Sequence, residues 1–173
     1  MMTSFKERLN HITTFIFDVD GVLTDGGVSL FKGEVVRTLN SRDGYALQYA
    51  AKMGYKIFII SGGNSKEVEN RLANLGITEV FMGSNNKVEI YNNLKSKYDI
   101  KDINVAYMGD DIPDYKVMQL VGLSSCPQDA AVEIKHISHY QSPFMGGRHC
   151  VRDLIEQVLR AQEKWFTQEA FEW

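Results

Sequence analysis

The sequence predicts an α/β fold, a Rossmann-like arrangement of three layers in which a parallel sheet lies between helices. Short apolar and β-branched runs, typical of buried strands, alternate with helical patterns of about ten residues or more. Two β-type segments joined by a Lys32-Gly33 turn follow the first strand directly, where a βαβ unit would place a helix. We therefore expect a β-hairpin inserted after the first strand of the sheet.

The individual elements are predicted from local patterns along the chain. Residues 1–11 form a short helical lead-in, and the apolar run at residues 12–17 is too short to span a membrane. The helix after the hairpin has apolar residues at helical spacing and stops at Gly54. The expected strands are residues 12–17, 28–31, 34–39, 55–60, 79–82, 105–108 and 122–124. The expected helices are residues 41–53, 66–75, 85–98, a short one through Met118, 128–134 and 151–165.

Length and composition favour a single domain spanning residues 1–173, of which 44% are hydrophobic. Within it we expect the hairpin insertion at about residues 26–39, and a C-terminal helix and loosely held tail at about 151–173. The net charge of −3 gives no electrostatic case for binding nucleic acid. The chain shows no charged-then-apolar leader, so we expect a cytoplasmic protein without a membrane anchor, whose Cys126 and Cys150 are reduced thiols.

Acidic residues follow two of the expected strands. Asp18 and Asp20 come directly after the first strand, and residues i and i+2 of an extended chain point to the same side. Asp110, Asp111 and Asp114 follow the strand at residues 105–108. Strand ends of a parallel sheet converge on one edge, where carboxylates would repel unless a divalent cation lay between them, and oxygen ligands favour Mg²⁺. The alternative is that these acids are solvated turn residues.

Two further segments add positive charge and an anion site. Ser61-Gly62-Gly63 follows the second strand of the sheet, and we expect it at a helix N-terminus, where backbone N–H groups can bind a phosphate. Lys87 lies in the first turn of another helix. Each segment alone is more often a simple turn or a solvated side chain. Together with the acidic cluster, they describe a site for phosphoryl transfer.

The order and spacing of these segments resemble a known superfamily. Asp18-Val19-Asp20-Gly21-Val22-Leu23-Thr24, then Ser61, Lys87 and Gly109-Asp110-Asp111 with Asp114, resemble the four motifs of the haloacid-dehalogenase-like phosphatases. Three more features resemble the small capless sugar-acid phosphatases of that superfamily: Asp25-Gly26-Gly27, Ser41-Arg42-Asp43-Gly44 and Gly146-Gly147-Arg148. The resemblance is strongest to the 3-deoxy-D-manno-octulosonate 8-phosphate phosphatases, over nearly the whole chain.

The resemblance implies a role for each motif residue. Asp18 would attack phosphorus and form an aspartyl-phosphate, and Asp20 would act as the general acid and base. Ser61, Gly62 and Lys87 would bind the phosphoryl oxygens. The implied Mg²⁺ ligands are Asp18, the backbone carbonyl of Asp20, and Asp110. Asp111 and Asp114 would lie behind these ligands or act as a further ligand through water, and Asp114 is also a candidate to fix Lys87.

The implied reaction is Mg²⁺-dependent hydrolysis of 3-deoxy-D-manno-octulosonate 8-phosphate to the sugar acid and phosphate, in lipopolysaccharide precursor synthesis. One position departs from the pattern: the octulosonate phosphatases typically carry Arg, and the nonulosonate phosphatases Glu, where this chain has Gly63. A nonulosonate 9-phosphate therefore stays an alternative substrate, and a catalytically idle phosphosugar-binding protein is a second alternative. Arg42 and Arg148 are the remaining candidates to pair with a substrate carboxylate, and His149 is a weaker one.

The resemblance also implies an assembly. A capless enzyme has no lid of its own, and the exposed hairpin has strand edges that need pairing. We therefore expect a homotetramer in which hairpins pack together and neighbouring subunits cover each other's sites.

Overall fold

The structure, a computed structural model, describes residues 4–172 and confirms the predicted α/β fold. Within these residues, six parallel strands form one sheet in the order β5-β4-β1-β6-β7-β8. The strands are β1 Thr14–Phe17, β4 Lys56–Ile60, β5 Glu79–Phe81, β6 Val105–Met108, β7 Leu123–Cys126 and β8 Tyr140–Gln141. The first strand, β1, lies between β4 and β6, so its carboxyl end opens at the middle of the sheet.

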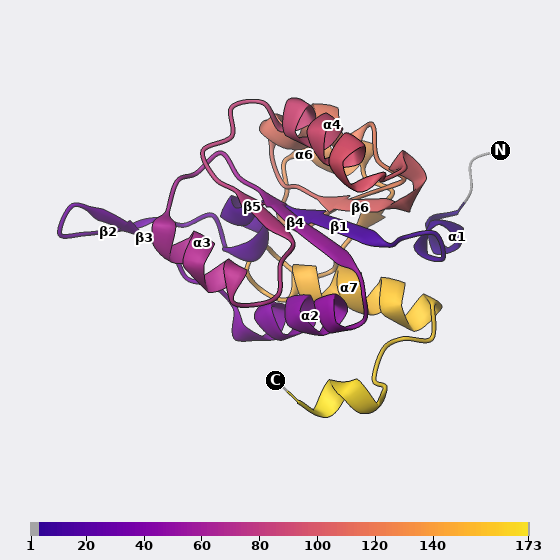
Figure 1. Cartoon of the computed structure of the whole chain (residues 1–173). Helices are drawn as coiled ribbons and strands as arrows, with labels where there is room; N and C mark the ends of the chain where they lie inside the picture. The colour runs from indigo at the N-terminus through magenta and orange to yellow at the C-terminus, as the bar shows by residue number, and fades with distance from the viewer. Residues whose placement is uncertain (1–3, 173) are drawn as a thin grey trace.

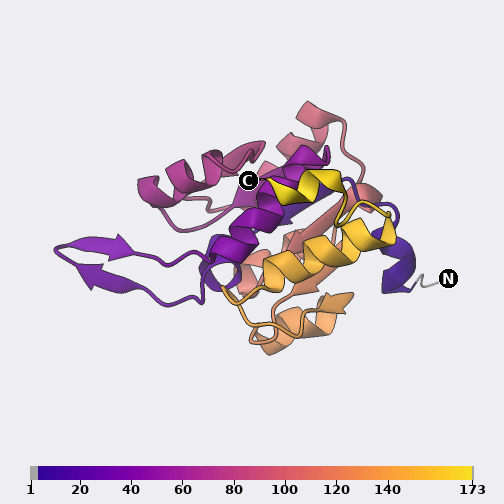
Figure 2. The same cartoon turned by 90° about the horizontal axis from the view of Figure 1, so that it is seen from below.

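Helices cover both faces of the sheet (Figure 1). The larger helices α2 and α7 pack on one face and α4 and α6 on the other, and Figure 2 shows α2 and α7 side by side. The helices are α1 Phe5–Leu9, α2 Ser41–Lys52, α3 Lys66–Ala73, α4 Lys87–Tyr98, α5 Tyr115–Met118, α6 Val132–Ile137 and α7 Cys150–Ala161. None of the helices in this part of the chain is long and apolar enough to cross a membrane.

Strand β1 shows how the sequence separates two hydrophobic cores. Phe15 and Phe17 pack into the core beneath α2 and α7, whereas Ile16 packs into the core beneath α4, α5 and α6. Successive side chains of a strand point to opposite faces, and a parallel sheet covered on both faces needs apolar residues at every position. All four residues of β1 are buried. The apolar run therefore leads the chain through the centre of the molecule to the acids that follow it.

The hairpin is the part of the molecule that leaves the sheet. Strands β2 Ser29–Phe31 and β3 Glu34–Val36 pair antiparallel and project away from the rest of the protein (Figures 1 and 2). Lys32 and Gly33 both have positive φ, which two-residue hairpin turns require. Its apolar side chains Val28, Leu30 and Phe31 are exposed.

Two local predictions between β7 and α7 were wrong. The helix expected at residues 128–134 covers Val132–Ile137 instead, because the backbone is extended at Ala131 (ψ 148°), where the Ala131 N–H donates to the Asp110 carbonyl of a neighbouring loop. Strand β8 was not expected, since a two-residue strand carries almost no sequence pattern.

The expectation of a loosely held tail was also wrong for residues 166–172. The Tyr49 hydroxyl accepts a hydrogen bond from the Thr167 N–H at 3.1 Å, and the Lys52 ammonium donates to the Glu172 carbonyl at 2.9 Å. The Tyr45 hydroxyl donates to the Ala170 carbonyl. These polar contacts dock a short helical turn, Gln168–Phe171, beside α2, although Phe166 and Phe171 themselves are exposed. The expectation for Trp173 lies outside the described residues.

Candidate active site

A cleft of about 520 Å³ opens at the carboxyl ends of β1, β4 and β6, where a doubly wound sheet places its ligands. Each of these strands ends in a predicted site residue: Asp18 follows β1, Ser61 follows β4, and Asp110 lies two residues beyond β6. The lining residues are Asp18, Asp20, Gly21, Gly26, Ser61, Gly62, Gly63, Ser84, Asn85, Lys87, Asp110, Asp111 and Pro113. The structure thus gathers segments that are up to about ninety residues apart in the sequence.

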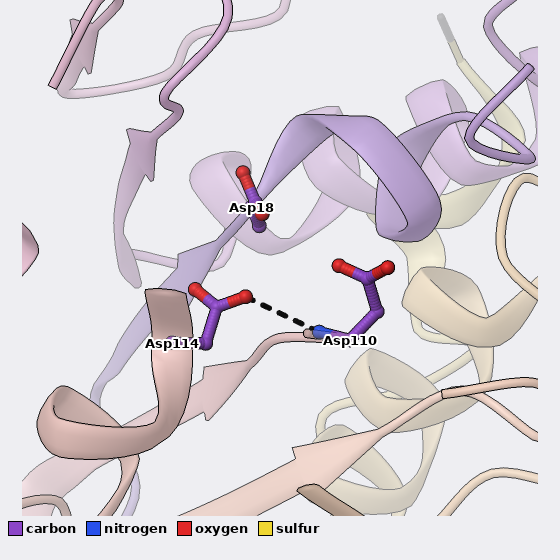
Figure 3. Close-up of side chains that lie close together, drawn as sticks. All are labelled: Asp18, Asp110 and Asp114. Atoms are coloured by element: carbon purple, nitrogen blue, oxygen red, sulfur yellow. Dashed lines mark hydrogen bonds between the residues drawn. The ribbon is translucent and has the colours of Figure 1, made fainter. Parts of the chain in front are cut away.

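Three carboxylates lie close together, two of them from residues that line the cleft (Figure 3). One oxygen from each of Asp18, Asp110 and Asp114 lies within 4.8 Å of the others. Asp114 comes from the helical turn Ile112–Asp114, and its Oδ2 accepts a hydrogen bond from the Asp110 N–H at 3.3 Å. Gly21 has φ of 82°, and a Cβ there would lie 1.9 Å from Asp110 Oδ2. A glycine is therefore required for the turn after β1 to approach Asp110.

The electrostatics of this cluster favour a bound cation. Burial, and then repulsion from Asp114, raises the pKa of Asp18 to about 7. Burial, and then repulsion from Asp18 and Asp114, raises the pKa of Asp110 to about 7. Crowded carboxylates that are costly to ionise are relieved by a divalent cation. Because all the donors are oxygen atoms, the residues fit Mg²⁺.

Lys87 supplies positive charge from the start of α4. Its ammonium lies 2.7 Å from Asp114 Oδ1 and 2.9 Å from Asp18 Oδ2, and its side chain is only 4% exposed. Burial lowers the pKa of Lys87, but attraction to Asp114 and Asp18 outweighs it and the pKa is raised. The Tyr107 hydroxyl also donates to Asp114 Oδ1, at 2.5 Å. Asp114 therefore uses one oxygen to hold Lys87 and Tyr107, as a residue that positions the ammonium.

Ser61 and the glycines that follow form one wall of the cleft. The Ser61 carbonyl accepts from the Ser84 N–H at 2.8 Å, which ties the loop after β4 to the loop after β5. The Gly63 N–H donates to Ser61 Oγ at 3.1 Å. The helix α3 is capped by Ser65 and begins at Lys66, so this loop precedes the helix cap rather than forming it. Ser61, Gly62 and Gly63 therefore line the cleft as part of a loop.

A comparison with known proteins decides the family. The haloacid dehalogenase-like hydrolase profile matches residues 77–145. The 3-deoxy-D-manno-octulosonate 8-phosphate phosphatase of Escherichia coli (strain K12) is 39% identical over 158 residues, which cover 91% of this chain and 84% of that relative. The chain belongs to the 3-deoxy-D-manno-octulosonate 8-phosphate phosphatase family of haloacid dehalogenase-like hydrolases.

Solved structures of this family share the fold over almost the whole chain. The Yersinia pestis phosphatase of the same name superposes with a TM-score of 0.90 at 35% identity, covering 92% of this chain and 87% of that one. The Moraxella catarrhalis phosphatase, in complex with magnesium ion, phosphate ion and a KDO molecule, has a TM-score of 0.91 at 30% identity and covers 95% of each chain.

One residue that contacts the cleft-lining Asp20 from a neighbouring hollow was missed by the sequence analysis. Arg37, just after β3 of the hairpin, pairs with both oxygens of Asp20: Nε to Oδ1 at 2.6 Å and Nη2 to Oδ2 at 3.1 Å. The hydrogen bond to Asp20 raises the pKa of Arg37. Position 37 lies in a segment that we expected to continue the hairpin as strand, and nothing local to it indicates a partner seventeen residues away.

Asp111 occupies a different place from the other acids. Its Oδ1 accepts from the Ile112 N–H at 2.8 Å and caps the turn that leads to Asp114. It lines the cleft but is exposed, and it is not part of the three-carboxylate cluster found among the described residues. Its predicted role as a metal ligand through water stays a prediction.

The structure does not bring Arg42 or Arg148 to the lining of the cleft. Arg42 borders a separate groove with His149 and Arg152. Arg148 borders another hollow, where its side chain is 70% exposed and lies 4.0 Å from Asp25. Within one chain, neither arginine reaches the phosphoryl site.

Gly146, before Arg148, and Asp43, after Arg42, support the structure beneath the cleft and do not line it. A Cβ on Gly146 would lie 2.0 Å from the Gly21 carbonyl oxygen, so the turn that carries Asp20 rests directly on this backbone. The buried Asp43 carboxylate accepts from the N–H groups of His149 and Arg152, capping α7 from α2. Both motifs therefore fix the support beneath the cleft.

Proposed function

We propose that this protein is a phosphoric monoester hydrolase that converts 3-deoxy-D-manno-octulosonate 8-phosphate to the free sugar acid and phosphate. The observation that carries the proposal is the Asp18–Asp110–Asp114 cluster with Lys87 between two of its members, at the strand ends of a chain in this family. The Moraxella relative holds magnesium, phosphate and KDO together, which supports the same substrate class here.

In this mechanism Asp18 attacks phosphorus with a carboxylate oxygen. Its Oδ1 accepts from the Val19 N–H at 2.6 Å, which fixes the carboxylate at the end of β1. Asp18 becomes an aspartyl-phosphate while the sugar oxygen leaves, so one difficult hydrolysis is divided into two easier steps. Asp20 gives a proton to the leaving oxygen and then takes one from the water that hydrolyses the intermediate.

The remaining residues bind and stabilise the phosphoryl group. Lys87, held by Asp114, and the Ser61 hydroxyl with the Gly62 backbone contact oxygens whose negative charge is distributed in the transition state. Asp18, the Asp20 carbonyl and Asp110 would hold Mg²⁺, with Asp111 contributing through water. The ion would supply neutralising charge that lets the phosphate approach three carboxylates.

A nonulosonate 9-phosphate is the alternative substrate. It stays open because Gly63 carries no side chain to distinguish an eight-carbon from a nine-carbon acid. Comparing kcat/KM for the two phosphates decides between them.

We further propose a homotetramer in the cytoplasm. The exposed apolar residues of the hairpin, which include Leu30 at 80% and Phe31 at 62% exposure, support packing against other copies of the chain. A monomeric mass by light scattering, together with full phosphatase activity of that monomer, would rule the tetramer out. Cell fractionation tests the cytoplasmic location.

The proposed function is tested by a phosphate-release assay over phosphorylated sugars and sugar acids with Mg²⁺ present. We expect Asp18→Asn to abolish turnover, because the amide is a poor nucleophile and uncatalysed phosphate-monoester hydrolysis is extremely slow. Asp99→Asn is the matched control, since Asp99 is exposed and its left-handed backbone suits Asn. Appreciable activity in Asp18→Asn would show that Asp18 is not the nucleophile.

A further inference from the structure

Arg37 has one donor group without a partner. Its Nε and Nη2 pair with Asp20, but Nη1 is buried and makes no hydrogen bond. The Arg37 side chain is only 7% exposed, although it comes from a hairpin that is otherwise exposed. A buried, unpaired guanidinium N–H is costly, so such a group usually has a ligand or partner that completes it.

Gly63 is the reason that Arg37 fits where it does. A Cβ at position 63 would lie 2.7 Å from Asp20 Oδ2 and 2.9 Å from Arg37 Nη2. Both distances are shorter than real Cβ contacts, so any side chain would displace the pair. The guanidinium therefore occupies space beside the cleft that a side chain at position 63 would take.

The pairing also shows what this guanidinium recognises. Two parallel N–H···O contacts to Asp20 are the geometry in which arginine binds a planar carboxylate. The proposed substrate carries such a carboxylate. Arg37, unlike Arg42 and Arg148, contacts a residue of the cleft through its pair with Asp20. We propose that Arg37 is the residue that recognises the carboxylate of the substrate, taking the place left open by Gly63. This inference rests on the proposed function and adds a specificity residue to it.

Arg37 thus binds one of two carboxylates at a time, either that of Asp20 or that of the substrate. Without substrate it holds both oxygens of Asp20 and fixes the carboxylate in the orientation of this pair. An arriving carboxylate replaces Asp20 on Arg37 and frees Asp20 to act on the sugar oxygen. Substrates without a carboxylate leave Arg37 on Asp20 and are turned over more slowly even at saturation.

The test measures phosphate release from 3-deoxy-D-manno-octulosonate 8-phosphate and from glucose 6-phosphate, which lacks a carboxylate. The variants are Arg37→Met, which removes the charge at similar length, and Arg37→Lys, which keeps the charge but loses the planar fork. Lys32→Met, at the tip of the same hairpin, is the matched control for charge removal. We compare kcat/KM for 3-deoxy-D-manno-octulosonate 8-phosphate divided by kcat/KM for glucose 6-phosphate. We expect Arg37→Met to lower this ratio about 10- to 100-fold, which is the effect of losing hydrogen bonds to a charged group. Arg37→Lys should lie between, and Lys32→Met should match the wild type.

The direction of the change separates recognition from support. In Arg37→Met, the kcat for glucose 6-phosphate should be unchanged or higher, because Asp20 is no longer held. An equal fall for both substrates would mean that Arg37 only supports Asp20, and an unchanged ratio would mean that another group reads the carboxylate. Either result overturns the proposal.

A second variant keeps the test valid if Arg37→Met does not fold. Gly63→Ala should also lower the ratio, because the added methyl displaces the Arg37–Asp20 pair; an unchanged ratio there overturns the proposal too. Wild-type protein that releases phosphate from neither substrate would refute the proposed function and this inference together. Wild-type activity with an unaffected ratio in the variants refutes only the inference.

Discussion

Two pairs of a basic residue with an acid each contribute one residue to the cleft lining, and they differ in what holds them. Lys87 and Asp114 are buried, at 4% and 1% side-chain exposure, and both come from elements packed on the sheet. Arg37 comes from the projecting hairpin, and although its own side chain is only 7% exposed, its partner Asp20 is 35% exposed. The first pair is fixed by the core, whereas the second can change with its surroundings. We infer that the phosphoryl side of the site is preorganised and the leaving-group side is adjustable.

The largest effect is expected from breaking the buried pair. Lys87→Met leaves Asp18 and Asp114 without their cation, and removing one partner of a buried pair costs about 3–5 kcal/mol of unfolding free energy. We also expect phosphatase activity to fall to near background. Urea unfolding without metal and phosphate release with Mg²⁺ measure the two effects.

Lys97→Met is the matched control for this prediction. Lys97 pairs with Glu79 at 2.7 Å on the surface, at 61% side-chain exposure, so its loss should change little. If Lys87→Met and Lys97→Met had the same free energy of unfolding, the Lys87–Asp114 pair would not be held more firmly than a surface pair.

A second, intermediate effect concerns pH and metal. In the metal-free protein the pKa values of Asp18 and Asp110 are raised to about 7 from 3.8. Between about pH 3.8 and pH 7, these two acids hold protons in the folded state that they have released in the unfolded state. The free energy of unfolding therefore falls as the pH rises toward 7. Above that range both acids are ionised and the full repulsion is present, which a bound cation relieves. Mg²⁺ should therefore raise the melting temperature more at about pH 8 than at about pH 5.

Thermal melting with and without excess Mg²⁺ at the two pH values measures this difference. Asp110→Asn should remove most of it, because the variant lacks one of the two titrating acids of the cluster. An equal shift at both pH values would contradict the electrostatic account of the site.

The smallest effect is expected from the hairpin pair. Arg37→Met should change unfolding free energy by only about 1 kcal/mol or less, since Asp20 is partly exposed and can be solvated by water. Urea unfolding of this variant beside Lys87→Met gives the comparison directly. A loss as large as that of Lys87→Met would show that Arg37 is structural, and the contrast between the two sides would fail.

Local pattern was enough to predict most elements, and the failures have physical causes. The run at residues 12–17 and the helix stripe after Asn40 are strong signals because burial imposes a period on the sequence. Residues 128–131 have a helical composition, but the backbone is extended at Ala131, whose N–H donates to the Asp110 carbonyl of another loop. The tail has little apolar pattern and is docked by hydroxyl and ammonium contacts to backbone carbonyls, which sequence spacing does not encode.

By itself, the sequence determined the sheet, the hairpin and the set of residues that converge on one edge, because strand ends of a parallel sheet must meet there. The order and spacing of its motifs also made the similarity to the phosphatase family visible. Only the tertiary structure decided which of these residues form ion pairs: Asp114 pairs with Lys87, and Asp20 pairs with Arg37. Only the structure placed Arg42 and Arg148 outside the cleft. The physical reason is that side-chain partners depend on distances between segments far apart in the chain, and no local period or composition specifies them.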